Sequence, residues 1–178
     1  MGQLSFATSK VDTLLTRVDK MGWEIAFDNT YTSGSPLSIP ATARTLLEND
    51  GAGAQSNNTY LPSGVSALWD TTNDKIISAQ VGNAFEVRVQ FECDPVSVDS
   101  HFDLEFDIGD GSPDVVIASR TITAPKAADP FTVSVAIPLF SLATFVANGC
   151  KIYLNTNDSG DAFTIYDIQV LIKQDYYA

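Results

Sequence analysis

The chain has 178 residues, of which 44% are hydrophobic and 18% are charged, which is enough apolar material for one domain with a sizeable core. The net charge is −12, with 10 Lys and Arg against 22 Asp and Glu. A surface of this charge repels phosphate, so the composition argues against a nucleic-acid-binding protein and favours solubility or a partner with basic patches.

Residues 1–22 are predicted to form a short helical arm. Apolar residues fall near heptad spacing here, and Ser9 followed by Asp12 resembles a capping box. The arm carries three basic and two acidic residues, whereas the rest of the chain carries seven and twenty. Two interpretations are open: the helix packs on its own domain, or it docks on another subunit or a larger scaffold. The candidate contact residues are Leu4, Val11, Leu14, Leu15, Val18 and Met21.

Turn residues dominate the chain between residues 28 and 68, after a first strand predicted at 23–27. Brief strands are expected at 37–39 and 44–47. A long irregular segment in a compact domain is typically surface loop or binding surface. Residues 69–75 are predicted to form a turn with an aromatic anchor.

The clearest strand is residues 85–92, where four apolar residues alternate with four polar ones, so one face is buried and the other is wet. Residues 102–108 show the same alternation, and residues 115–123 are their predicted partner. Residues 131–137 form another inward row, and Pro95 is expected to end the central strand because proline cannot donate to a ladder.

The C-terminal third is predicted to contain a short helix or turn at 138–146, followed by a closing pair of strands at 151–154 and 163–173. The whole pattern of short strands and turn-rich loops predicts an all-β fold, an antiparallel sandwich or jelly roll. We therefore divide the chain into an arm, 1–22, and a β-sandwich domain, 23–178.

The sequence contains no recognisable signal for export or for insertion into a membrane. There is no apolar signal region and no run long enough to span a bilayer, so we expect no membrane partner. Cys93 and Cys150 can form at most one bridge, and without an export signal we expect both thiols to be free and buried.

No catalytic residue is predicted with a specific motif. His101 is the one histidine, which excludes sites that need two imidazoles, and we expect a surface or edge histidine. Asp103, Glu105 and Asp107 would lie on one strand face at intervals of roughly 6.8 Å, a spacing comparable to that of glycosidase carboxylates. An alternating wet face offers no apolar pocket to raise a pKa, so a solvated acidic stripe is the preferred interpretation.

Two loops carry oxygen ligands of the kind that Ca²⁺ prefers. One contains Asp107, Asp110 and Asp114, and the other contains Asn155, Asn157, Asp158 and Asp161. Neither has EF-hand spacing, and turn chemistry alone explains both. We therefore predict neither a metal nor another cofactor.

The stretch IPATARTLLENDGAGA, followed by LPSG, LWD, DKI and VGNAFEVRVQFE, resembles the small jelly-roll proteins of tailed-bacteriophage virions, whose fold is similar to the TNF/C1q type. The resemblance covers about residues 23–173 and contains no diagnostic catalytic motif. It implies a trimer that serves as a capsid decoration (cement) protein or head fibre, or as a receptor-binding fibre tip.

This resemblance gives a set of expectations for the function. The first is a structural virion protein made in the host cytoplasm, placed on the capsid surface, and partnered by itself and by the major capsid protein through the arm. The alternative is a receptor- or glycan-binding fibre or tail-tip module that uses the loop aromatics Tyr31, Tyr60 or Trp69. An enzyme that uses the row from Asp103 to Asp107 is the third and least favoured reading, and we predict no enzyme.

Overall fold

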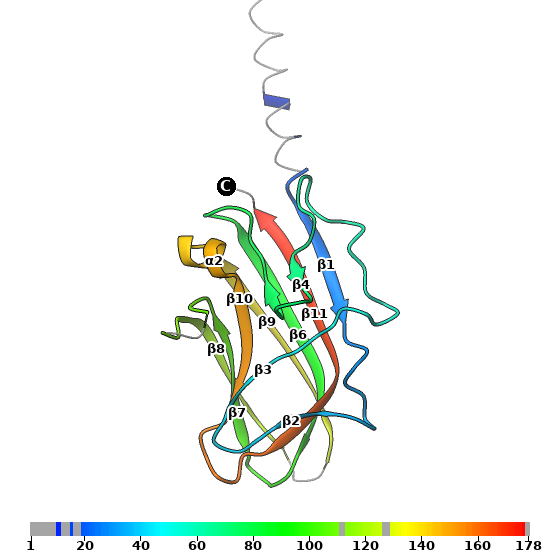
Figure 1. The fold of residues 1–178 in the computed structure, drawn as a ribbon, viewed down its shortest axis with the longest axis vertical. Coiled ribbons are helices and arrows are strands. Elements are labelled where there is room, and N and C mark those ends of the chain that lie inside the picture. The colour runs from blue at the N-terminus through cyan, green and yellow to red at the C-terminus, as the bar shows by residue number, and fades with distance from the viewer. Residues whose placement is uncertain (1–9, 12–14, 16–18, 111–112, 126–128, 177–178) are drawn as a thin grey trace, which may run out of the picture.

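The computed structural model describes residues 10–11, 15, 19–110, 113–125 and 129–176. Within this part of the chain, the fold is an antiparallel β-sandwich (Figure 1). The elements are β1 (Gly22–Phe27), β2 (Leu37–Ile39), β3 (Arg44–Leu46), β4 (Trp69–Asp70), β5 (Lys75–Ile76), β6 (Ala84–Pro95), β7 (His101–Asp107), β8 (Val116–Thr123), β9 (Phe131–Phe140), α2 (Ala143–Asn148), β10 (Cys150–Asn155) and β11 (Phe163–Tyr176).

The strands form two sheets. The first sheet has five strands in the order β1-β11-β6-β9, with β2 also paired to β11. The second sheet has six strands in the order β4-β5-β10-β7-β8, with β3 also paired to β10. Apart from the consecutive pairs β4-β5 and β7-β8, neighbouring strands in each sheet come from distant parts of the sequence, as in a jelly roll. The all-β jelly-roll prediction is confirmed.

The core lies between the two sheets and is built by the predicted alternation. Val87, Val89 and Phe91 of β6 are almost completely buried, and so are Phe102, Leu104 and Phe106 of β7. Phe102 packs against the rings of Phe91 and Phe163, at centroid distances of 6.1 and 4.9 Å. Aromatic contacts of this kind add to the burial energy and join the two sheets.

The two thiols follow the prediction. Cys93 and Cys150 are both free and both buried. Burial raises the pKa of Cys93 to about 12, with a further contribution from the neighbouring carboxylates Asp94 and Glu92. The pKa of Cys150 is also raised by burial.

Two predictions about the C-terminal third are wrong. β9 continues through Pro138 to Phe140, and the helix begins only at Ala143; the strand tolerates proline because β9 is the edge of the first sheet. The strands β10 and β11 do not pair, because β10 joins β3, β5 and β7 whereas β11 joins β1, β2 and β6. The loop between them therefore crosses from one sheet to the other.

Residues 69–75 contain more strand than predicted. Trp69 and Asp70 form β4, which pairs with β5 across a turn held by the Asp70 carboxylate, whose Oδ1 accepts the backbone N–H of Thr72 at 3.0 Å. Trp69 is buried, and its ring N–H donates to the carbonyl of Asn49 at 3.0 Å. In the described part of the chain, no helix is both long and apolar enough to cross a membrane.

Candidate interaction site

The base of the N-terminal arm is fixed to the sandwich by hydrogen bonds. The carbonyl of Asp19 accepts the N–H of Ser63 at 2.7 Å, and the Lys20 ammonium donates to the carbonyl of Ser63 at 2.9 Å. The side chain of Gln174 on β11 is buried and donates to the carbonyl of Lys20 at 2.6 Å. The arm therefore leaves the domain from a defined point at the start of β1.

The described apolar residues of the arm face solvent. Lys10, Val11 and Leu15 are helical, and the side chains of Val11 and Leu15 are 52% and 57% exposed. Met21, at the base, is also exposed. Leu4, Leu14 and Val18, together with the predicted capping box, lie outside the described residues. The arm thus presents apolar side chains that its own domain does not cover.

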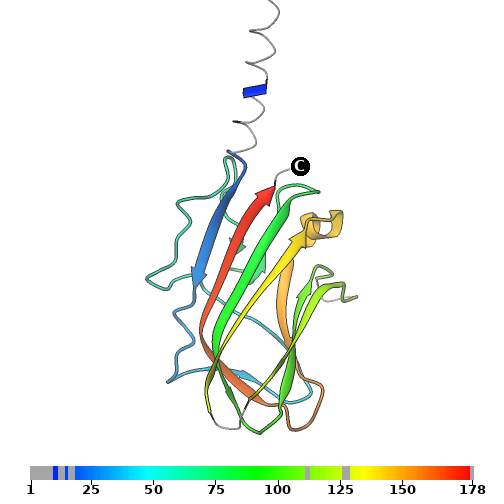
Figure 2. The same ribbon diagram turned by 180° about the vertical axis from the view of Figure 1, so that it is seen from behind.

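One row of mostly apolar residues crosses the outer face of the first sheet, and the sequence did not single it out. Figure 2 shows β1, β11, β6 and β9 side by side on this face. The strand register places Ile25, Leu171, Arg88 and Ala136 in one row across the four strands. Arg88 is the one charged residue in this row, and its Nε atom is buried without a hydrogen-bond partner among the described residues.

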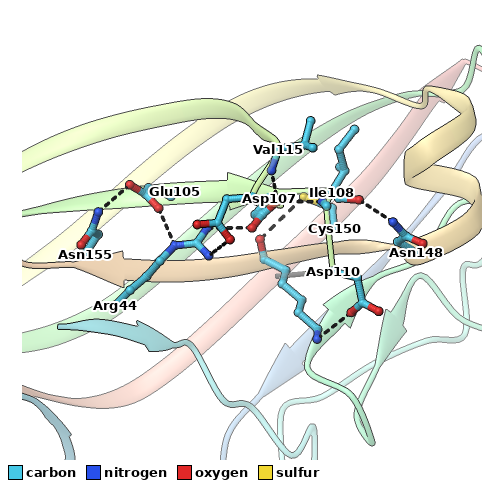
Figure 3. A network of polar contacts seen from close by, with 12 residues as sticks. Arg44, Glu105, Asp107, Ile108, Asp110, Val115, Asn148, Cys150 and Asn155 are labelled. Carbon is cyan, nitrogen blue, oxygen red and sulfur yellow. Dashed lines mark hydrogen bonds and ion pairs between the residues drawn. The ribbon is translucent and has the colours of Figure 1, made fainter. Parts of the chain in front are cut away.

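The acidic row on β7 does not form a solvated stripe. Asp107 is buried, with its side chain only 1% exposed, and its Oδ2 lies 2.8 Å from Nη2 of Arg44. The same guanidinium binds Glu105 at 2.8 Å (Figure 3). It also binds Asp114 at 2.8 Å. The prediction that Asp107 is solvated is therefore wrong: the strand β3 brings Arg44 over the row.

The chemistry of Asp107 is that of a structural carboxylate. Burial on its own would raise its pKa, but the N–H of Gly109, the guanidinium of Arg44 and the N–H of Val115 all bind the ionised form, and the net pKa lies below the ordinary value. A glycosidase acid needs the opposite shift. Asp110, the remaining member of the first predicted Ca²⁺ loop, binds the Lys151 ammonium at 2.9 Å, so the chain's own cations already bind Asp107, Asp110 and Asp114.

The loop aromatics predicted to bind glycans have different environments. Trp69 is buried, so it cannot stack on a sugar, and that part of the prediction is wrong. Tyr31 is half-buried, and its hydroxyl donates to the Glu48 carboxylate. Tyr60 is exposed and stacks on Trp23 with ring centroids 5.1 Å apart.

The second loop with oxygen ligands is separated by the fold into two parts. Asn155 lies on β10, where its amide donates to Glu105 at 2.9 Å. Asp158 and Asp161 lie instead beside His101, which is half-exposed and begins β7 as an edge-of-strand histidine. This proximity could not be predicted from sequence patterns, because 60 residues separate His101 from Asp161.

Comparison with known proteins shows the fold. No protein-family model matches the chain, and no curated protein matches it significantly. Among solved structures, the chain is similar to the Eiger TNF of S. frugiperda, with a TM-score of 0.50, 11% identity, and coverage of 89% of this chain and 95% of that one.

Two further solved structures are similar at lower scores. The PRD1 vertex protein P5 aligns with a TM-score of 0.44 and 18% identity over 86% of this chain and 96% of that one. A CBM4 structure aligns with a TM-score of 0.44 and 16% identity over 86% and 95%. At these identities, the likeness to the TNF structure establishes a TNF-like jelly roll, and the function has to be argued from the surfaces.

Proposed function

We propose that this protein is a structural component of a virion, in which the N-terminal arm attaches the jelly roll to a larger protein lattice. In its finer form, the proposal is a capsid decoration (cement) protein on the outer head surface, which acts as a homotrimer and contacts the major capsid protein through the arm. The proposal follows the sequence resemblance to phage virion jelly rolls and the geometry of the arm.

The observation that carries the proposal is an apolar arm with a fixed base. Val11 and Leu15 expose about half of their surface, while Asp19 and Lys20 are hydrogen-bonded to the sandwich. Burying each aliphatic side chain in a partner contributes about 1.5–3 kcal/mol of gross burial energy. Three linked arms would then multiply the strength of attachment through avidity.

The outer face of the first sheet supports self-association. Ile25, Leu171 and Ala136 form an apolar row, and the buried Nε of Arg88 in the same row has no acceptor among the described residues. A second subunit on this face would cover the apolar side chains and provide an acceptor for Arg88, because buried donors are normally satisfied. We place the contact between copies here.

A non-enzymatic role is part of the proposal. It is supported by the Arg44 network, in which Glu105 and Asp107 both bind the guanidinium and the pKa of Asp107 is lowered. Carboxylates bound in this way are suited to holding β3 on the sandwich, whereas acid catalysis needs one carboxyl with a raised pKa.

The alternative role, a receptor- or glycan-binding fibre or tail-tip module, has one supporting observation. Tyr60 exposes an aromatic face, which is the group that stacks on sugars. The Trp23 that it stacks on lies in β1 next to the arm, however, so the pair sits at the attached end of the domain. A glycan array probed with the assembled protein and with Tyr60→Ala tests this role; hits that vanish in the variant would favour it over decoration.

Immunogold electron microscopy tests the main proposal. Antibody raised against the sandwich is applied to particles produced from the genome that encodes the chain. Gold on the outer head surface is the expected result. Gold confined to the tail would point to the fibre role, and unlabelled particles would overturn the virion proposal.

A further inference from the structure

A cluster of three side chains lies at the end of the sandwich far from the arm. Figure 1 shows the loop between β10 and β11 at the lower end, whereas β1 starts at the upper end. This loop brings Asp158 and Asp161 to His101 at the start of β7. One ring nitrogen of His101 and one carboxylate oxygen from each aspartate lie within 4.8 Å of one another.

Asp161 has one satisfied and one unsatisfied carboxylate oxygen. Its Oδ1 accepts the backbone N–H of His101 at 3.0 Å. Its Oδ2 is buried and accepts no hydrogen bond from any described residue, and it points to Nδ1 of His101 at 3.4 Å. The side chain as a whole is only 5% exposed. A buried carboxylate oxygen without a donor is costly, so this geometry calls for a positive charge at that point.

The two loops that carry the cluster are fixed to each other. The N–H of Val96 donates to the carbonyl of Ala162 at 3.1 Å, and the hydroxyl of Ser97 donates to the carbonyl of Gly160 at 2.6 Å. The buried Ser100, which precedes His101, also donates to Gly160 at 3.3 Å. These bonds hold Asp161 and His101 in place, which lowers the reorganisation needed for a ligand to bind.

We propose that His101, Asp158 and Asp161 bind a divalent transition-metal ion, for which Zn²⁺ is the best match. An imidazole nitrogen with two carboxylates suits Zn²⁺, whereas Ca²⁺ prefers an all-oxygen set. Ligand atoms bonded at about 2.1 Å in a tetrahedron are about 3.4 Å apart, which agrees with the 3.4 Å between Nδ1 of His101 and Oδ2 of Asp161. The proposal departs from the expectation from sequence that no metal binds.

Asp158 completes the site from the solvent side. Its side chain is 75% exposed, and its Oδ2 lies 4.0 Å from Nε2 of His101, so a rotation about its side-chain bonds brings it onto the ion at small cost. Three protein ligands leave at least one coordination position for water or for an outside ligand. The site therefore places an open metal ion at the free end of the domain.

Isothermal titration calorimetry with ZnCl₂ tests the proposal on the full chain without a histidine tag. We expect saturable binding of one Zn²⁺ per chain and at least tenfold weaker binding of Ca²⁺. His101→Ala and Asp158→Asn should each weaken Zn²⁺ binding at least tenfold. Asp158 is exposed, so its variant gives a second result if the histidine variant folds poorly. Asp99→Asn is the matched control, because it removes the same charge two residues from His101 but outside the cluster, and it should bind Zn²⁺ as the wild type does.

Imidazole NMR signals give a second readout, because the chain has a single histidine. Zn²⁺ should shift the ring signals of His101 in step with the calorimetric titration. Absence of saturable Zn²⁺ binding would overturn the proposal. Binding that persists unchanged in both the His101 and the Asp158 variants would overturn it as well.

Discussion

Arg44 on β3 and Asp107 on β7 form an ion pair of 2.8 Å, although β3 pairs with β10 and not with β7. The arginine side chain crosses β10 and stacks on the ring of Tyr153, with 3.8 Å between the guanidinium carbon and the ring centroid. Arg44 therefore joins three strands of the second sheet. These contacts fix the position of β3, because a three-residue strand has too few backbone hydrogen bonds to be held firmly by them alone.

Replacement of Arg44 by methionine should destabilise the domain. The change leaves the buried Asp107 carboxylate without its cation, and losing one partner of a buried pair costs about 3 kcal/mol. Urea denaturation followed by tryptophan fluorescence measures the free energy of unfolding. Arg120→Met on β8 is the control, because Arg120 is exposed, and it should change that free energy by less than about 0.5 kcal/mol. Equal effects of the two substitutions would show that the Arg44 network adds nothing to stability.

The carboxylate of Asp107 makes the free energy of unfolding depend on pH. The pKa of Asp107 is lowered in the folded chain, so its contribution is full above the unfolded pKa, about 3.9, and disappears as the pH falls through the folded value. We expect the difference in free energy of unfolding between wild type and Asp107→Asn to be largest near neutral pH and to narrow below about pH 4. Urea titrations at a series of pH values measure this difference. A difference in free energy of unfolding that stays constant down to pH 2 would contradict the lowered pKa of Asp107.

The buried thiols should be unreactive while the protein is folded. Burial raises the pKa of Cys93 to about 12 and also raises the pKa of Cys150, so the reactive thiolate is scarce at pH 8. We expect Ellman's reagent to label no thiol in the native protein and both thiols in 6 M guanidinium chloride. Rapid labelling of the native protein would indicate that one edge of the sandwich opens readily.

The strands were predictable wherever one face is buried and the other is wet. Phe85–Glu92 alternates because Val87, Val89 and Phe91 are in the core, and β7 shows the same pattern. Pro138 was misread because a sequence does not tell an edge strand from a central one. The pairing of β10 and β11 was misread because adjacent strands usually form hairpins, whereas this loop crosses between sheets.

Sequence patterns could not predict the two polar sites, the Arg44 network and the His101 cluster. Arg44 is 63 residues from Asp107, and His101 is 60 residues from Asp161, so both contacts exist only through the fold. Alternation placed Asp107 on the outer face correctly, yet it could not show that Arg44 covers that face. The division of the chain at residue 22 and the contact role of the arm stay predictions.

The outer face of the first sheet should control self-association. We expect light scattering to give about three times the chain mass of 19.2 kDa for the wild type and the mass of a single chain for Leu171→Lys, because a second cation beside Arg88 in the apolar row would be buried without a partner. Val98→Lys is the control, because Val98 is exposed in the loop between β6 and β7, and it should leave the mass unchanged. A wild-type monomer would refute the trimer, and a Leu171→Lys trimer would move the contact to another face.

The arm is tested most directly by co-sedimentation of the purified protein with assembled particles that lack it. We expect the wild type to pellet with the particles. The double variant Val11→Ser, Leu15→Ser should stay in the supernatant with an unchanged free energy of unfolding, because these exposed side chains contribute to binding and not to the core. The double variant Val96→Ser, Val98→Ser changes two valines that are more exposed than Val11 and Leu15 and lie at the other end of the domain, and it should pellet as the wild type does. Pelleting of the arm variant at the wild-type level would contradict attachment through the arm.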